Sequence, residues 1–337
     1  MIPSGVYRSV TIGVSTIGIL ANILLIFLAR YVKSPTLGEY SSVVTIFACF
    51  DMTMCILNAV LLPTTHSVEY GHIMFLRGIA GWDTTISPIL LFIFLVFFHQ
   101  TFIMVAYHFI YRYVSVACNV YCPYISYRKF WYLLGVSVNV IYLASIAMLT
   151  VQLLPTHDSD AYFKPILQEI YGINASSYVP YMWIRYVIPR GSEEPRYNPT
   201  HIVCVSAFTV ENVFIATTII YSSYSISQMI GSLSQTSRIS HRQILRALLV
   251  QTTVPMLSSF LPVGFAFISP MLGIKVGTSS NYIALILELF PAIDPMIIIF
   301  FVKPYRNKLE RFGRKLIPVK TQRNSSYIMA SLVGQQL

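Results

Sequence analysis

Charged side chains are scarce in this chain of 337 residues: Asp, Glu, Lys and Arg make up 11% of it, whereas soluble proteins carry roughly 25%. Because apolar residues make up 55%, the chain cannot cover a soluble globule with polar groups. Five cysteines are too few for a disulfide-built secreted scaffold. The HExxH and GxSxG motifs and metal-ligand spacings are also missing, so we predict neither an enzyme nor a cofactor or metal site. The composition predicts a membrane protein.

Long apolar segments occur seven times, and each reaches the length of about 20 residues that a helix needs to cross about 30 Å of hydrocarbon. We predict an all-α bundle of seven transmembrane helices, which forms one domain over residues 1–302. A cytoplasmic helix and tail follow at residues 303–337. The predicted spans are residues 9–29, 41–62, 84–111, 130–154, 201–227, 247–274 and 276–302.

The basic residues define the orientation of the bundle. Most of the 23 Lys and Arg lie in the first, third and fifth gaps between spans and in the tail. Since cytoplasmic loops carry an excess of Lys and Arg, the N-terminus is predicted outside and the C-terminus inside. Their position in short gaps between apolar runs also argues against a nucleic-acid partner.

Ionisable residues inside spans cost a few kcal/mol and usually face the bundle interior or water. Asp51 lies midway along the second span, and Asp294 lies between Pro291 and Pro295 in the seventh. Each proline frees the carbonyl four residues earlier, so irregular polar backbone is expected beside a carboxylate. These four residues predict a polar core, either a hydrated pocket that repacks between two states or a pair of protonated acids bonded to neighbouring helices.

Two glutamates, Glu211 and Glu288, lie nearer the outer halves of their spans. We expect them either to reach a ligand cavity or to extend toward the lipid headgroups.

The third span ends in the polar run His108, Tyr111, Arg112 and Tyr113 at the predicted cytoplasmic boundary. His108 and Arg112 are four residues apart and share a helix face, so the run is either a switch or only a polar helix end. His99 lies on the face opposite His108, which argues against a metal pair within this helix.

The sixth span contains Gln251, Pro255 and Pro262 in one helical run. Prolines bend a membrane helix because neighbouring groups must bond the freed carbonyls. We expect a hinge, or a static kink, in this span.

Residues 304–317 place Tyr305, Leu309, Phe312 and Leu316 at spacings of four, three and four, with basic residues elsewhere around the helix. This pattern predicts an amphipathic helix bound to the lipids of the anionic inner leaflet. On the opposite side, the long connection of residues 155–200 contains the sequon that begins at Asn174, where we expect glycosylation.

Three motifs together carry a family resemblance: the run from His108 to Tyr113, the run from Leu245 to Pro255, and the run from Pro291 to Pro295 followed by Tyr305 and Arg306. On these residues the chain resembles the nematode seven-transmembrane chemoreceptors of the Str family of serpentine receptors, over roughly residues 9 to 312. The resemblance implies a G-protein-coupled receptor in the plasma membrane, in the cilium of a chemosensory neuron. It also implies a small odorant or a small secreted signal as ligand and a heterotrimeric G protein as partner.

The resemblance further implies that Arg112 meets the G protein and that Asp294 and Pro295 occupy the place of an Asn/Asp-Pro motif. The sequence departs from the usual receptor pattern in two ways. Tyr111, rather than an acid, precedes Arg112, and the predicted extracellular gaps hold no cysteine for the usual disulfide to the third span.

A ligand is expected among spans three, five, six and seven. The alternative function is a ligand-gated ion channel or a proton-coupled transporter that uses Asp51 and Asp294 as a polar path. A current or flux that persists without a G protein would favour that alternative.

Overall fold

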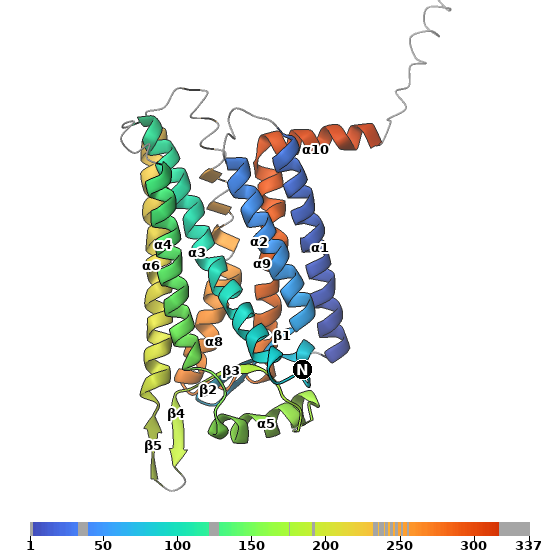
Figure 1. Ribbon diagram of the computed structural model, residues 1–337, viewed down its shortest axis with the longest axis vertical. Coiled ribbons are helices and arrows are strands. Elements are labelled where there is room, and N and C mark those ends of the chain that lie inside the picture. Colours follow the sequence, from blue (N-terminus) through green and yellow to red (C-terminus); the bar gives the residue numbers. More distant parts are fainter. Residues whose placement is uncertain are drawn as a thin grey trace, which may run out of the picture.

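The computed structural model describes residues 3–32, 40–120, 128–174, 176–190, 193–231 and 256–316, together with residues 235, 239, 242, 245, 246, 249, 250 and 252–254. Within these residues, six helices are long and apolar enough to cross a membrane. They are α1 (Ser4–Tyr31), α2 (Tyr40–Leu61), α3 (Ile86–Val120), α4 (Arg128–Val151), α6 (Pro199–Ile230) and α9 (Asn281–Phe301). Figure 1 shows them side by side in one bundle.

The sixth span in chain order is built from shorter pieces. A π-helix (Met256–Phe260) leads directly into α8 (Leu261–Met271), and the described residues 252–254 before it are helical. α8 alone rises only about 16 Å, so it cannot cross the hydrocarbon without the turns that precede it. With this span the fold is the predicted all-α bundle of seven membrane helices.

Two of the differences between the predicted span boundaries and the helices have a local physical cause. The apolar part of α3 ends at Tyr111, but the helix continues to Val120, because a helix bonds its own backbone in water as well as in lipid. α9 begins at Asn281 rather than at residue 276, since Gly277 adopts a positive φ of 62° and a short 3-10 helix (Thr278–Ser280) follows it.

An extracellular cap covers the end of the bundle where α1 begins (Figure 1). It consists of α5 (His157–Tyr171) and an antiparallel sheet with the strand order β1-β2-β3. The strands are β1 (Pro63–Val68), β2 (Gly71–Leu76) and β3 (Tyr181–Arg185), and a 3-10 helix, η1 (Arg77–Ile79), follows β2. A separate hairpin of β4 (Val187–Arg190) and β5 (Glu193–Tyr197) leads into α6. The described residues of the connection 155–200 therefore form a helix and strands that we did not predict.

The sheet of the cap has two different faces because successive side chains of a strand alternate. On β2, His72 and Met74 face the bundle, whereas Ile73 and Phe75 pack in a hydrophobic cluster with Phe163 of α5. The cap is thus a two-layer structure, with the sheet between the bundle and α5.

Hydrogen bonds attach the cap to the bundle without a disulfide. The backbone and ring nitrogens of Trp183 donate to Leu153 O and Leu154 O, both at 3.0 Å, just beyond α4. Ser67 of β1 exchanges two backbone hydrogen bonds with Gly277 before α9. Hydrogen bonds therefore hold the connection of residues 155–200 and its sheet in place, since the extracellular gaps contain no cysteine for a disulfide.

At the opposite end of the molecule, α10 (Lys303–Leu316) turns sideways from α9, passes the end of α1 and extends beyond the side of the bundle (Figure 1). Tyr305 is fully buried, and the ring of Phe312 contacts Phe27 of α1 at 6.0 Å between centroids. Leu309 and Phe312 remain partly exposed, as expected for an amphipathic helix that rests on the inner leaflet.

Candidate functional site

A cavity of about 260 Å³ lies between the bundle and the cap. Its walls come mainly from α3, α6, the sixth span and α9, with Thr150 of α4 beside them, and its extracellular end is the inner face of the sheet. This is the position among the third, fifth, sixth and seventh spans at which we expected a ligand. The residues that face it include Leu95, Phe98, His99 and Phe102 of α3, Phe208, Thr209, Asn212 and Val213 of α6, Phe260, Val263, Gly264 and Phe267 of the sixth span, Ile283 and Leu287 of α9, and Thr65, His72, Met74 and Met182 of the sheet.

The cavity wall is mainly aliphatic and aromatic. Its polar groups are only partly engaged within the protein. Asn212 Nδ2 donates to Phe208 O (2.7 Å) and His72 Nδ1 lies 2.9 Å from Ser67 Oγ, whereas Asn212 Oδ1 and His99 Nδ1 are buried without a hydrogen-bond partner among the described residues. The ring of His99 stacks on Phe208, with 5.1 Å between centroids. Among the described lining residues there is no Asp, Glu, Lys or Arg. Such a wall suits an uncharged, mainly apolar molecule.

Glu211 and Glu288, which we expected either at a ligand cavity or near the headgroups, are not among the described residues that line this cavity. Glu211 accepts a hydrogen bond from Ser145 Oγ of α4 (2.6 Å). Glu288 is buried against α1, where the Tyr7 hydroxyl lies within hydrogen-bonding distance of both Glu288 Oε1 (3.3 Å) and the Pro63 carbonyl. Both glutamates therefore join neighbouring helices, because a carboxyl group in hydrocarbon needs a polar partner.

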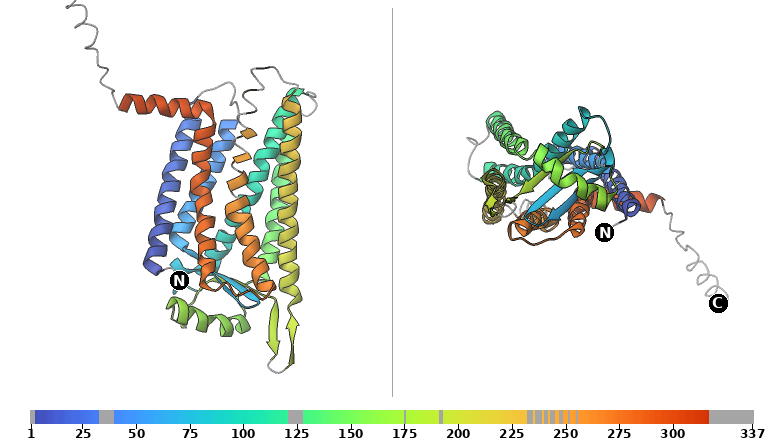
Figure 2. Two further views of the ribbon diagram at one scale, coloured as in Figure 1. Left: turned by 180° about the vertical axis from the view of Figure 1, so that it is seen from behind. Right: turned by 90° about the horizontal axis from the view of Figure 1, so that it is seen from below.

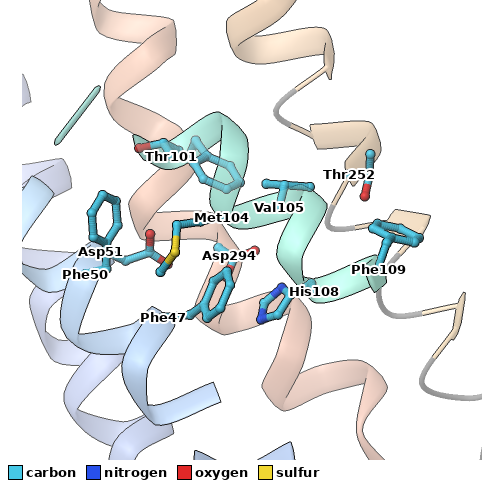
Figure 3. A pocket seen from close by; sticks show the side chains of 11 residues that line it. Phe47, Phe50, Asp51, Thr101, Met104, Val105, His108, Phe109, Thr252 and Asp294 are labelled. Atoms are coloured by element: carbon cyan, nitrogen blue, oxygen red, sulfur yellow. The ribbon is translucent and has the colours of Figure 1, made fainter. Parts of the chain in front are cut away.

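The predicted polar core exists as a cluster on the cytoplasmic side of the cavity. Asp51, His108 and Asp294 are all at most 5% exposed, and they line a second, much smaller cavity of about 10 Å³, roughly enough for one water molecule. Figure 3 shows these side chains around one space, with Met104 and Phe47 beside them. Asp51 and Asp294 are hydrogen-bonded to each other. A bond between two carboxyl groups requires one of them to carry a proton.

The freed carbonyl that Pro295 leaves at Pro291 finds a partner on another helix. Asn22 of α1, which is fully buried, donates from Nδ2 to Pro291 O and to Gly18 O, both at 3.0 Å. Gly18 makes the close approach possible, since a Cβ there would lie 2.5 Å from Cys55 Sγ and 3.1 Å from Ala292 Cα. Sequence reasoning missed Asn22 because it searched the spans for formal charges; an amide in an apolar run was the available signal.

The predicted switch run is divided between two environments. His108 faces the polar core, where its ring stacks on Phe47 at 3.5 Å, so it is a buried core residue rather than a residue of the cytoplasmic boundary. Tyr111 and Tyr113 are half-buried against the core. Arg112 follows the apolar part of α3 directly, and its side chain is outside the described part of the structure.

The predicted hinge is only partly described. Gln251 and Pro255 lie outside the described residues. Pro262 is the second residue of α8, where a missing backbone N–H is tolerated, and the π-helix (Met256–Phe260) immediately precedes it. A π-helical turn departs from regular hydrogen bonding, and such turns are frequent at functional sites.

Asn174 lies after α5 on the extracellular side and is exposed. Its Oδ1 accepts hydrogen bonds from Ser176 N (3.1 Å) and Ser176 Oγ (3.0 Å). Its glycosylation stays a prediction, with an accessible side chain in its favour.

Comparisons with known proteins agree with this architecture. Squid rhodopsin has a similar fold, with a TM-score of 0.56 at 13% identity over 100% of this chain and 93% of its own. Serpentine receptor class r-10 of Caenorhabditis briggsae is 24% identical over 86% of this chain and 85% of its own length. G-protein coupled receptor str-33 of Caenorhabditis elegans is 23% identical over 86% of this chain and 85% of its own length. The family described as "Serpentine type 7TM GPCR chemoreceptor Str" matches residues 8–310, and the chain therefore belongs to this family of multi-span membrane receptors.

Proposed function

We propose that the chain is a chemosensory receptor that binds a small, uncharged odorant in the cavity beneath the cap and activates a heterotrimeric G protein. The observation that carries this proposal is the apolar cavity of about 260 Å³ among the third, fifth, sixth and seventh spans. It is slightly smaller than the 300 to 1,000 Å³ typical of drug-sized ligands, which favours a volatile molecule of few heavy atoms.

The cytoplasmic end of the cavity offers a route by which a ligand can act on the bundle. Phe102 of α3 and Phe260 of the π-helix both face the cavity, and their rings meet edge to face at 4.5 Å between centroids. A ligand that separates this pair moves α3 relative to the sixth span at the irregular turn before Pro262. Such a ligand shifts the equilibrium only if it binds one arrangement more tightly than the other.

The polar core lies on the cytoplasmic side of this ring pair, and it is the next element that a movement of α3 would disturb. His108 shares α3 with Phe102, and Asp294 shares α9 with the cavity residue Leu287. Repacking of these groups would expose the cytoplasmic end of α3, where Arg112 meets the G protein. Because the family comprises chemoreceptors, we place the receptor in the ciliary plasma membrane of a sensory neuron.

The test is a screen of odorants in cells that express the tagged full chain, with G-protein dissociation and membrane current recorded together. We expect a ligand to produce dissociation in the wild type and none in Arg112→Ala at equal surface level. The matched control is Arg306→Ala, which removes a cation of α10 that pairs with Glu310 at 3.8 Å on the surface. It should keep most of the response, because exposed ion pairs contribute about 0 to 1 kcal/mol.

Full signalling by Arg112→Ala would refute the role of this arginine. A ligand-dependent current that survives both G-protein blockade and Arg112→Ala would refute the receptor proposal as a whole. In that case Asp51→Asn and Asp294→Asn would test the channel or transporter alternative.

A further inference from the structure

The cap closes the cavity toward the extracellular water with two layers of protein. Thr65, His72 and Met182 form the sheet side of the cavity, and each is at most 8% exposed. On the other face of the sheet lies α5, whose Phe163 and Leu167 are at most 2% exposed. A ligand that arrives from the extracellular water would therefore have to displace both layers and the bonds that hold them.

The wall formed by α6 is different because two of its residues belong both to the cavity and to the outer surface. Thr209 and Val213 line the cavity, yet both are exposed, Val213 to 59%. A residue that faces both spaces lies on the rim of an opening. At 1.5 Å per residue these positions are about 15 to 21 Å from Pro199, where α6 begins, which is within the hydrocarbon of about 30 Å. The outer surface at this depth faces lipid tails rather than water.

The opposite rim is α8, which lies between α6 and α9 in the end-on view and in the view from behind (Figure 2). Gly264 of α8 lines the cavity, and a Cβ added to it would have nothing within 4 Å. No other described atom therefore fills the space in front of this glycine. Together with its half-buried neighbour Val263, Gly264 makes the α8 rim of the opening apolar.

From these rims we infer that the ligand reaches the cavity sideways, from the lipid bilayer, between the fifth span and the sixth, and that it is a neutral lipophilic molecule. The inference rests on the proposed function in that the same cavity binds the ligand. The bilayer route adds a requirement on chemistry, because only a molecule that partitions into hydrocarbon can use it. An engineered cavity of about 150 Å³ binds benzene, so about 260 Å³ accommodates a molecule of roughly naphthalene size.

The test measures binding kinetics of the full chain in lipid nanodiscs with tritiated 2-acetylnaphthalene, a neutral probe of this size. Val213→Trp places a large side chain in the opening. We expect both association and dissociation to slow by at least about tenfold, which corresponds to 1.4 kcal/mol in the barrier. Thr209→Phe on the same rim is a second variant with the same expected direction.

The matched control is Val210→Trp, at a lipid-facing position of α6 that is 68% exposed and is not among the cavity residues. It should leave both rates unchanged. Naphthalene-2-sulfonate has the same rings but a charge that keeps it in water, and it should not bind.

Unchanged rates in both rim variants would overturn the lateral route, and binding of the sulfonate as fast as the ketone would do the same. Failure of the wild type to bind the ketone would overturn the ligand class. Because the assay contains no G protein, it separates these failures from a failure of the proposed signalling. Normal binding with no G-protein response to any odorant would contradict the proposed function but not the lateral route.

Discussion

The extracellular cap and the polar core lie on opposite sides of the cavity, and they hold their buried polar groups in different ways. In the cap, strands pair their backbones, and buried side chains form local pairs such as His66 with Tyr171 (3.1 Å) and Ser67 with His72 (2.9 Å). In the core, Asp51 and Asp294 are hydrogen-bonded to each other next to a space for about one water molecule. Asp294 belongs to α9, a helix with two internal prolines.

This difference indicates which side of the cavity can move. Regular pairing fixes one arrangement of the cap, because any shift of register would break many bonds together. The core depends instead on a carboxyl pair, proline-freed carbonyls and a π-helical turn, which lie outside the regular hydrogen-bond pattern of a helix. A ligand between the two regions would therefore act mainly on the core, with the cap as a fixed support.

Removing a large side chain from the cap is the change with the largest expected effect on this support. Phe163 is fully buried between α5 and the sheet, so Phe163→Ala should lower the free energy of unfolding by about 3 to 5 kcal/mol and reduce surface expression. Phe214→Ala, at a position that is 71% exposed to lipid, is the control with the same chemical change. Thermal unfolding in nanodiscs would compare them, and equal losses would contradict a tightly packed cap.

The second largest expected effect is a loss of stability of the cap at acidic pH. Burial lowers the pKa of His66 to about 4, helped by the positive charge of Lys275, and burial together with His66 lowers the pKa of His72 to about 4. In the unfolded chain both pKa values are near 6.5. Between pH 6.5 and 4 the unfolded state therefore binds protons that the folded state does not, so stability is complete above this window and falls as the pH decreases through it.

At pH 5 the expected loss relative to pH 7 is roughly 2 kcal/mol for each histidine. Unfolding temperatures at the two pH values would measure it. The double variant His66→Gln with His72→Gln should flatten the dependence, whereas His157→Gln, at an exposed position of α5, should not. A double variant that keeps the full dependence would show that the acid response lies outside the cap.

The same comparison explains which parts of the fold could be predicted. In lipid each backbone group must be bonded within its own helix, so apolar length nearly suffices to identify a span. The cap lacks such a signal. The turn between β1 and β2 uses Tyr70 at a φ of 57° rather than an Asn-Gly pair, and both strands are buried on both faces, so no polar alternation marks them. β3 pairs with β2 from a distant part of the chain, and α5 contains Pro165.

The site was predictable where it depends on charge and hidden where it depends on apolar shape. Asp51 and Asp294 were found because carboxyl groups are rare in apolar runs. The cavity wall could not be found in this way, since Phe208 lines the cavity and Phe214 faces lipid, yet both are phenylalanines of one helix. Charge alone did not determine the surroundings of Glu211 and Glu288, because a carboxyl group can equally join two helices.

The variant with the smallest expected effect tests whether the polar core can adopt more than one arrangement. Asn22→Leu keeps the side-chain size but leaves Pro291 O without its bond from α1. Interhelical hydrogen bonds in membranes contribute on average about 0.6 and at most about 1.7 kcal/mol, so the loss of stability should be near 1 kcal/mol.

The control for this variant is Thr16→Val on the same helix, which removes a bond of 2.8 Å to Ile12 O on the exposed side of α1. It should change stability by less than Asn22→Leu, because its carbonyl keeps the regular helical bond, whereas Pro295 cannot donate to Pro291 O. Ligand-independent G-protein activity should rise in Asn22→Leu and stay unchanged in Thr16→Val, since only the first bond ties α1 to the proline-containing part of α9. A large stability loss with unchanged activity would instead mean that the core, like the cap, is held in a single arrangement.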